Sequence, residues 1–158
     1  MEIVNIRIDE RLIHGQVATA WTQHLHPSRI MVVDAAAIKD DIQKMALKMA
    51  CPPGVKLSIL SPRKAAENLS SGKYTGERIF MVMKNPASLR QIYEAGFTGF
   101  GSVTVGNMSV RGNCKNVGRT VNVNEQDIEN FKFLGEKGVK VVTQMVPNDS
   151  AADLLGQL

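Results

Sequence analysis

The segment Glu2–Gln16 reads EIVNIRIDERLIHGQ, and the interpretation of the rest of the chain starts from it. Its first part, Glu2 to Ile8, is rich in β-branched residues and predicts a buried strand. Apolar residues at helical spacing begin near Val17 and continue to Leu25, so a helix follows. The order strand, charged loop, helix is typical of an α/β fold, in which such a loop lies at the carboxyl end of its strand.

Further β-branched runs recur along the chain, with segments of helical period between them. Their central members are apolar on both faces, as strands of a parallel sheet covered on both sides must be. These predicted strands are Ile30–Val33, Val55–Leu60, Arg78–Met83, Ser102–Val105 and Val139–Gln144. We therefore predict an α/β fold: a single open, mainly parallel sheet with helices on both faces.

Capping residues mark where three of the helices start. Ser61-Pro62 and Asn85-Pro86 each place a side-chain cap before a proline, which suits the first helical position. Asn124 followed by Asp127 predicts the start of a third helix. Each of these segments continues with apolar residues at helical spacing and then reaches a glycine, which favours the end of a helix.

A fourth helix is predicted between Ala35 and Pro52. The apolar residues of this segment recur on one face, which comprises Ile42, Met45, Ala46 and Met49. We expect this face to pack into the core, with the methionines filling irregular gaps between neighbouring side chains.

The segment Gly106–Asn124 interrupts this regular pattern because it is rich in glycine and asparagine. We expect it to form two short antiparallel strands around a turn at Arg111–Asn116, at an edge of the sheet. Its basic residues, Arg111, Lys115 and Arg119, are expected to be solvated rather than to form a binding patch.

Length and composition indicate one compact domain over residues 1–158. The net charge of +4 arises from 19 basic and 15 acidic residues that are dispersed along the chain. Such a distribution does not suit a nucleic-acid binder, although it would favour an anionic group or an acidic partner.

Two features bear on the location of the protein. Cys51 and Cys114 have neither the number nor the spacing of a disulfide framework or a zinc knuckle, so we expect free thiols in a reducing cytoplasm. The charged residues within Met1–Arg11 exclude a signal peptide, and no apolar stretch approaches the length needed to span a bilayer. We expect a cytoplasmic protein whose membrane association depends on a partner.

Residues whose side chains could bind a ligand or take part in catalysis concentrate in the loop after the first strand. His14 stands where the next helix begins, and Gly15 leaves its flank uncrowded. The free backbone N–H groups of Gly15 and Gln16 would face an anion held at the imidazole. Arg7 and Arg11 add guanidinium groups whose paired donors suit phosphate oxygens.

Spacing alone leaves several roles open for His14. It could act as a general base oriented by Asp9 or Glu10, as a nucleophile that takes a phosphoryl group, or as a structural histidine at a helix start. His24 and His26 lie too far along the chain to share a metal ion with it, and we expect no metal site. No nucleotide-binding glycine motif is present, and we expect no cofactor.

The run Arg7–Val17, RIDERLIHGQV, strongly resembles the IIB subunit of the mannose/fructose/sorbose family of the bacterial phosphoenolpyruvate-dependent sugar phosphotransferase system. The resemblance extends over essentially the whole chain. Further matching segments are Ser28-Arg29-Ile30, Pro52-Pro53-Gly54-Val55, Gly76-Glu77-Arg78, Asn85-Pro86, Val105-Gly106-Asn107-Met108, Asp127-Ile128-Glu129 and Gly138-Val139. An eleven-residue run with a central histidine is far more specific than a glycine pattern.

The resemblance implies a phosphohistidine–sugar phosphotransferase component. His14 would accept a phosphoryl group on Nδ1 from a phosphohistidine of a separate IIA protein, and pass it to a sugar held by the IIC and IID membrane subunits. Arg11 would steady the phosphoryl group as a catalytic residue. Arg7, Asp9, Gly15 and Gln16 complete the predicted phosphate-binding set, in which Asp9 would orient either Arg11 or the imidazole.

The chain departs from the family at two positions, and two other functions stay open. Ala35 stands where the family often has a second acidic residue, and Gln43 stands where some members have a basic one. A small acid/base enzyme that pairs His14 with Asp9 would show no covalent phosphate. A regulatory binding module would tolerate the loss of His14.

Overall fold

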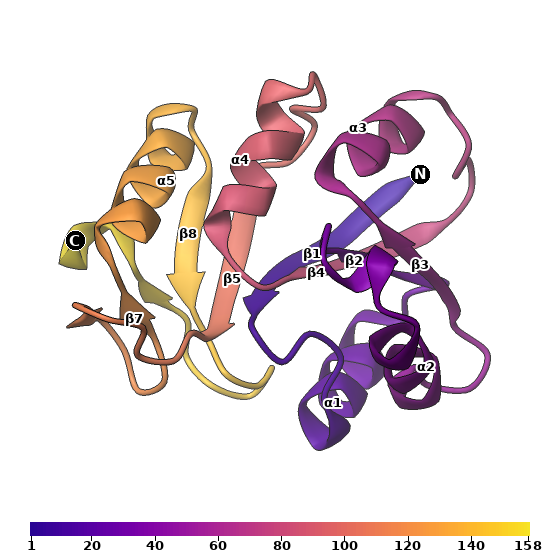
Figure 1. Cartoon of the computed structure of the whole chain (residues 1–158), viewed down its shortest axis with the longest axis horizontal. Helices are drawn as coiled ribbons and strands as arrows, with labels where there is room; N and C mark the ends of the chain where they lie inside the picture. Colours follow the sequence, from indigo (N-terminus) through magenta and orange to yellow (C-terminus); the bar gives the residue numbers. More distant parts are fainter.

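A seven-stranded sheet runs through the protein in the order β3-β2-β4-β1-β5-β8-β9 (Figure 1). The computed structural model describes residues 1–158. All neighbouring strands are parallel except β8 and β9, which pair antiparallel at one edge. The strands of the sheet are β1 (Glu2–Asp9), β2 (Arg29–Val33), β3 (Lys56–Leu60), β4 (Arg78–Met83), β5 (Ser102–Asn107), β8 (Lys140–Thr143) and β9 (Ala152–Asp153).

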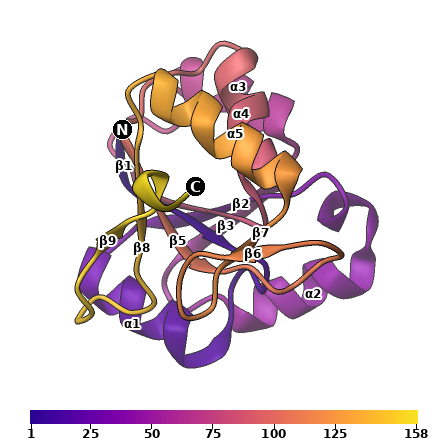
Figure 2. The same cartoon turned by 90° about the vertical axis from the view of Figure 1, so that its left-hand side faces the viewer.

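Helices cover both faces of the sheet, as the sequence predicts. Figures 1 and 2 show one group of helices on one face of the sheet and a second group on the other. The first group is α3 (Pro62–Ser70), α4 (Pro86–Glu94) and α5 (Glu125–Glu136); the second is α1 (Gly15–Leu25) and α2 (Asp41–Ala50). Short 3₁₀ turns, η1 (Ala37–Lys39) and η2 (Leu155–Gln157), precede α2 and end the chain. None of the helices combines the length and apolarity that a bilayer-spanning segment requires.

The strand order places the end of β1 in the middle of the sheet. β1 pairs with β4 on one side and with β5 on the other, and its Ile8 lies beside Met83 of β4 with both side chains fully buried. In the sheet, β2 lies on one side of β1, beyond β4, and β5 lies on the other side. The chain therefore moves from β1 to one side and later returns to the other. The carboxyl end of β1 is therefore the kind of crevice at which open α/β sheets bind ligands.

The predicted helix caps are confirmed. The Ser61 hydroxyl accepts a hydrogen bond from Lys64 N at 3.1 Å, and the Asn85 side chain accepts one from Ser88 N at 3.1 Å. Asn124 and Asp127 form a reciprocal pair, in which each side chain accepts the backbone N–H of the other. These bonds satisfy amide groups that the first turn of a helix leaves without partners.

The prediction that the apolar face of α2 packs into the core is wrong. Ile42, Met45 and Met49 are 84%, 65% and 82% exposed, and the fully buried residue of this helix is Leu47. The side of α2 that faces the protein is formed instead by Gln43, Lys44, Leu47 and Ala50, which are buried or half-buried. Helical periodicity identifies a stripe but not the direction in which the stripe faces.

The Gly106–Asn124 segment forms a hairpin, but its turn was predicted in the wrong place. Its strands are β6 (Lys115–Asn116) and β7 (Asn122–Val123), which form a separate two-stranded sheet, so the connection lies after Asn116 rather than at Arg111–Asn116. The Asn116 side-chain amide donates to Gly118 O at 2.8 Å and so stabilises this connection. Arg111 is not simply solvated, because it pairs with Asp127 at the start of α5.

The cap of α5 gives a stability prediction. Replacing Asn124 with Ala removes the side chain that accepts Asp127 N, and we expect this to lower the free energy of unfolding by roughly 0.5–2 kcal/mol. Urea denaturation followed by the fluorescence of the single tryptophan, Trp21, measures the change. Gln126→Ala, at an exposed position of the same helix, is the control. Equal stabilities of the two variants would contradict the prediction.

Candidate functional site

Two buried side chains give the loop after β1 its shape. Leu12 and Ile13 are about 5% and 6% exposed and pack in the cluster beneath α1 and α2. Leu12 N donates to Asp9 O at 2.9 Å, and Leu12 itself has a φ of 59°, in the left-handed region that is unfavourable for a branched side chain. With these two anchors turned inward, the next residue, His14, is exposed.

His14 is the N-cap residue of α1, with an extended backbone at φ −139° and ψ 110°. Its side chain makes no capping hydrogen bond, so the imidazole is not committed to the helix. Gly15 follows with a φ of 42°, which an L residue rarely adopts and which glycine permits. The first-turn N–H groups at Gly15, Gln16 and Val17 have no partners inside the helix, and an anion near the imidazole would meet their positive end.

Asp9 fixes the neighbouring guanidinium of Arg11. One Asp9 oxygen accepts Arg11 Nε at 3.0 Å and the other accepts Arg11 Nη2 at 2.9 Å, while Arg11 N also donates to Asp9 at 3.0 Å. The sequence left open whether Asp9 orients Arg11 or the imidazole of His14. These hydrogen bonds show that Asp9 orients Arg11. The hydrogen bonds to Asp9 raise the pKa of Arg11, because they favour its charged form.

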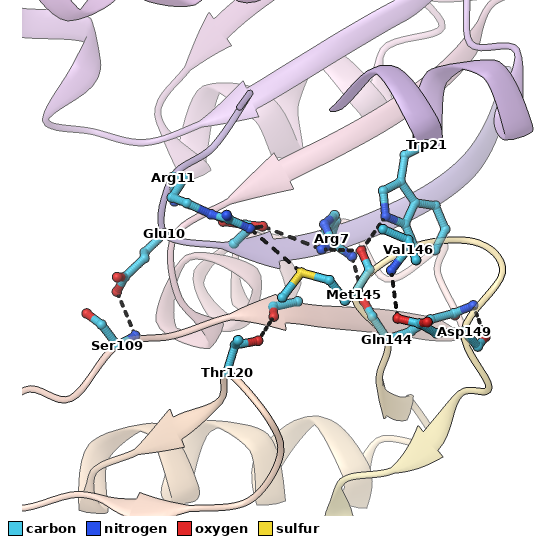
Figure 3. A network of polar contacts seen from close by, with 12 residues as sticks. Arg7, Glu10, Arg11, Trp21, Ser109, Thr120, Gln144, Met145, Val146 and Asp149 are labelled. Carbon is cyan, nitrogen blue, oxygen red and sulfur yellow. Dashed lines mark hydrogen bonds and ion pairs between the residues drawn. The ribbon is translucent and has the colours of Figure 1, made fainter. Parts of the chain in front are cut away.

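Arg7 lies underneath this pair and is buried. Its Nη1 donates to Gln144 O at 2.8 Å and its Nη2 to Met145 O at 2.9 Å, across more than 130 residues of sequence (Figure 3). Nη2 also lies 3.4 Å from Asp9, and the guanidinium stands 5.1 Å from the centre of the Trp21 ring. Burial lowers the pKa of Arg7, an effect that the Asp9 carboxylate opposes. The hydrogen bonds of Arg7 therefore go to the loop after β8 and to Asp9.

The loop after β8 is itself organised by several polar contacts. Trp21 Nε1 donates to Met145 O at 2.9 Å, the same carbonyl that Arg7 holds. The Gln144 side chain donates to Asp149 O at 2.9 Å and to Pro147 O at 3.3 Å. Met145 Sδ lies 3.9 Å from Arg11 Nη2 (Figure 3). This loop thus touches both arginines of the site.

Two further acidic side chains at this edge of the sheet also have partners. The Glu10 carboxylate accepts Ser109 N at 3.0 Å and ties the loop to the segment that follows β5 (Figure 3). Asp34 and Lys84, at the ends of β2 and β4, form an ion pair at 3.3 Å. Lys84 directly follows Met83, which pairs with Ile8, so this ion pair lies at the same edge of the sheet as Asp9. No group of three or more His, Cys, Asp or Glu side chains is placed to hold a metal ion.

Sequence reasoning singled out His14, Arg11, Arg7 and Asp9 but missed the backbone groups that hold Arg7. The carbonyls of Gln144 and Met145 carry no residue-specific signal, because every residue has one. Gly106 is different: a Cβ at this position would lie 1.8 Å from Arg7 Nη2, so only glycine leaves room for the guanidinium. In the sequence, the indication for Gly106 was its place in the segment Val105–Met108, which resembles the family.

Comparison with known proteins agrees with this geometry. Residues 3–158 match the family model of the PTS system sorbose subfamily IIB component. The chain belongs to this family. It is 32% identical to the sorbose-specific EIIB component of Lacticaseibacillus casei, a match that covers 100% of this chain and 96% of the relative. As a sorbose-subfamily IIB component, it has a role in sugar phosphotransfer by the phosphotransferase system.

Other relatives and solved structures extend the comparison. The mannose-specific EIIAB component of Escherichia coli K12 is 38% identical over 143 residues, which cover 90% of this chain and 44% of that protein. The fructose-specific EIIB component of Bacillus subtilis is 34% identical, with 98% of this chain and 94% of the relative covered. The crystal structure of the IIBSor domain of the Klebsiella pneumoniae sorbose permease superimposes with a TM-score of 0.94 at 30% identity, covering 99% and 96% of the two chains.

The tight contact at Gly106 gives a second prediction. Gly106→Ala displaces the Arg7 guanidinium from Gln144 and Met145, and we expect roughly 1–3 kcal/mol of destabilisation, as for other overpacked sites. The fluorescence of Trp21 should shift as well, because its N–H shares the Met145 carbonyl with Arg7. Gly101→Ala is the matched control, since a Cβ there meets nothing within 4 Å. The prediction fails when both variants have the stability of the parent.

Proposed function

We propose that His14 is the phosphoryl carrier of this IIB component, taking the group from a phosphorylated IIA protein and giving it to a sugar held by the IIC and IID membrane subunits. The proposal rests on the exposed imidazole of His14, which stands at the N-terminus of α1 and makes no capping hydrogen bond. Three residues before it, the guanidinium of Arg11 is fixed by the buried carboxylate of Asp9. Phosphoryl transfer depends mostly on positioning and on stabilising charge, and these groups supply both.

In the first transfer, the lone pair of Nδ1 of His14 forms a bond to phosphorus while the P–N bond to the donor histidine breaks. The donor ring keeps the electron pair of that bond and gains a proton, and the ring of His14 loses the proton on its other nitrogen. In the second transfer, a sugar hydroxyl oxygen bonds to phosphorus and releases its proton. As this bond forms, the P–N bond to His14 breaks, its electron pair returns to Nδ1, and the ring takes up one proton, so that a neutral imidazole is restored and the proton count balances.

The neighbours of His14 act on the charge that moves. Arg11 would hold phosphoryl oxygens with the donors that Asp9 leaves free, and the first-turn amides of Gly15 and Gln16 would add hydrogen bonds. Asp9 and Arg7 serve as positioning residues, because their contacts run to Arg11 and to the loop after β8. The net charge of +4 would favour approach of an anionic donor.

The acid/base alternative is disfavoured by the contacts of the two carboxylates. Both oxygens of Asp9 accept bonds from Arg11, and Glu10 accepts the backbone of Ser109, so neither carboxylate orients the imidazole. The carrier role also accounts for the exposure of His14, because a group that is exchanged between proteins must be reachable by both of them. It places the protein in the cytoplasm, with membrane contact made through IIC and IID.

Covalent labelling tests the carrier role. With phosphoenolpyruvate and the upstream phosphocarriers, including the cognate IIA protein, we expect one acid-labile phosphoryl group per chain, located on His14 by mass spectrometry. His14→Ala should abolish the label with the fold intact, while His24→Ala, on the exposed side of the same helix, should keep it. A label on serine or aspartate, or full labelling of His14→Ala, would refute the assignment.

The role of Arg11 is tested by a change that keeps its charge. Arg11→Lys retains a cation but loses the two-point contact with Asp9, and we expect transfer to slow by roughly tenfold or more, the factor that about 1.4 kcal/mol represents. Thermal unfolding should change little. Arg63→Lys, at an exposed position on α3, is the control in the same rapid-quench assay. An unaltered transfer rate in Arg11→Lys would remove this residue from the mechanism.

A further inference from the structure

The exposed stripe on α2, formed by Ile42, Met45 and Met49, is an apolar surface feature that the fold does not explain. The chain has five large apolar side chains that are exposed, and three of them belong to this stripe. Large apolar residues gathered on one helix face, rather than scattered singly, mark a contact surface. Within the chain nothing packs over them.

A groove joins this stripe to the neighbourhood of His14. It has a volume of about 510 Å³ and lies between α1 and the end of α2. Its lining residues are Gly15, Gln16, Thr19, Ala20, Gln23, Met49 and Ala50. Gly15 and Gln16 directly follow His14, and Met49 is the last member of the stripe. The stripe, the groove and the imidazole therefore belong to one continuous surface.

Cations predominate at the groove end of this surface. Neither Gly15–Leu25 nor Gln43–Ala50 contains an aspartate or a glutamate, although the chain has 15 acidic residues. Lys48 lies in the last turn of α2, near Met49, and Arg11 precedes His14 by three residues at the other end of the groove. Asp41 directly precedes Ile42 and pairs with Lys44 at 3.9 Å. The acidic groups and their partner therefore lie at the start of α2, and the unpaired Lys48 lies toward Met49 and the groove. An apolar surface bordered by cations fits a partner whose apolar patch is bordered by acidic groups.

We propose that the stripe and the groove together form the surface on which the phosphoryl donor protein docks, and that the donor presents an apolar patch with an acidic border beside its phosphohistidine. This inference rests on the proposed function of His14 and specifies how the partner is recognised. Standard protein interfaces bury roughly 800 Å² on each partner, so a donor that reaches His14 must also cover its surroundings. The α2 side offers the exposed apolar area for this purpose.

The dimensions of the surface favour a transient partner over a second copy of the chain. Permanent homodimers bury roughly 2,000 Å² or more in predominantly apolar interfaces, whereas the stripe comprises three side chains on a helix of ten residues. Flexible methionines suit a contact that must form and dissociate at every transfer. A membrane surface is a weaker fit, because lipid seated on α2 would cover the groove that leads to His14.

Transfer kinetics test this docking surface. We expect the triple variant Ile42→Asn, Met45→Gln, Met49→Gln to raise the KM for phosphorylated cognate IIA by roughly tenfold or more, with the maximal rate per chain unchanged. The three positions are exposed, so thermal unfolding should match that of the parent. The control is Lys64→Gln with Glu67→Gln, which removes an exposed ion pair on α3 and keeps the net charge.

Methionine methyl resonances provide a direct readout in the unmodified protein. On addition of the IIA protein, the ¹³C-methyl signals of Met45 and Met49 should shift or broaden, while those of the buried Met31 and Met81 should not. Added NaCl should weaken the effect, because the cationic border contributes to association. Shifts confined to other methionines would overturn the proposal.

The remaining outcomes separate this inference from the function on which it rests. If the parent chain is never labelled on His14, the carrier role fails. If the parent is labelled and the triple variant keeps the parental KM, the docking surface alone is wrong. Three further results would assign the stripe to other partners and overturn the inference: a parental dimer lost in the variant with donor transfer unchanged, a defect confined to transfer to the sugar, or binding of α2 to anionic vesicles that blocks transfer from IIA.

Discussion

The site depends on one buried carboxylate held between two guanidinium groups. Asp9 is 1% exposed and sits at the end of the central strand, where an unpaired charge would be strongly unfavourable. The guanidinium groups of Arg11 and Arg7, which both pair with Asp9, supply the compensating positive charge. Removing one member of such a buried pair typically costs roughly 3–5 kcal/mol, so the three residues are expected to keep or lose their geometry together. The position of Arg11, and with it the site at His14, follows from this constraint.

The same arrangement connects the site to the end of the chain. The Arg7 side chain reaches from β1 to the carbonyls of Gln144 and Met145. Trp21, on α1, donates a hydrogen bond to the second of these carbonyls. Gly106 provides the space in which the guanidinium lies. The loop after β8 is therefore part of the support of the site, through its contacts with Arg7 and Arg11. The carrier role proposed for His14 requires such a rigid base, because phosphoryl transfer is sensitive to small errors of position.

The surface around the site is divided in function. On one side, Glu10 and Ser109 fasten the loop of His14 to the segment after β5. On the other side, α1 and α2 leave a groove between them, and α2 turns its apolar residues to solvent. A fixed reactive group beside an adaptable apolar surface is an arrangement that suits a protein which must bind and release its partners repeatedly.

The sequence by itself determined the parallel sheet, the helix caps at Ser61, Asn85 and Asn124, and the charged loop that carries His14 between the first strand and the first helix. These are local properties: strand runs, capping side chains and an eleven-residue motif are each written in neighbouring residues. Only the tertiary structure decided that Asp9 orients Arg11, that Arg7 is bonded to the loop after β8, and that the stripe on α2 faces outward. Backbone carbonyls from more than 130 residues away and the rotation of a helix about its axis leave no local pattern, because both are set by how distant segments pack.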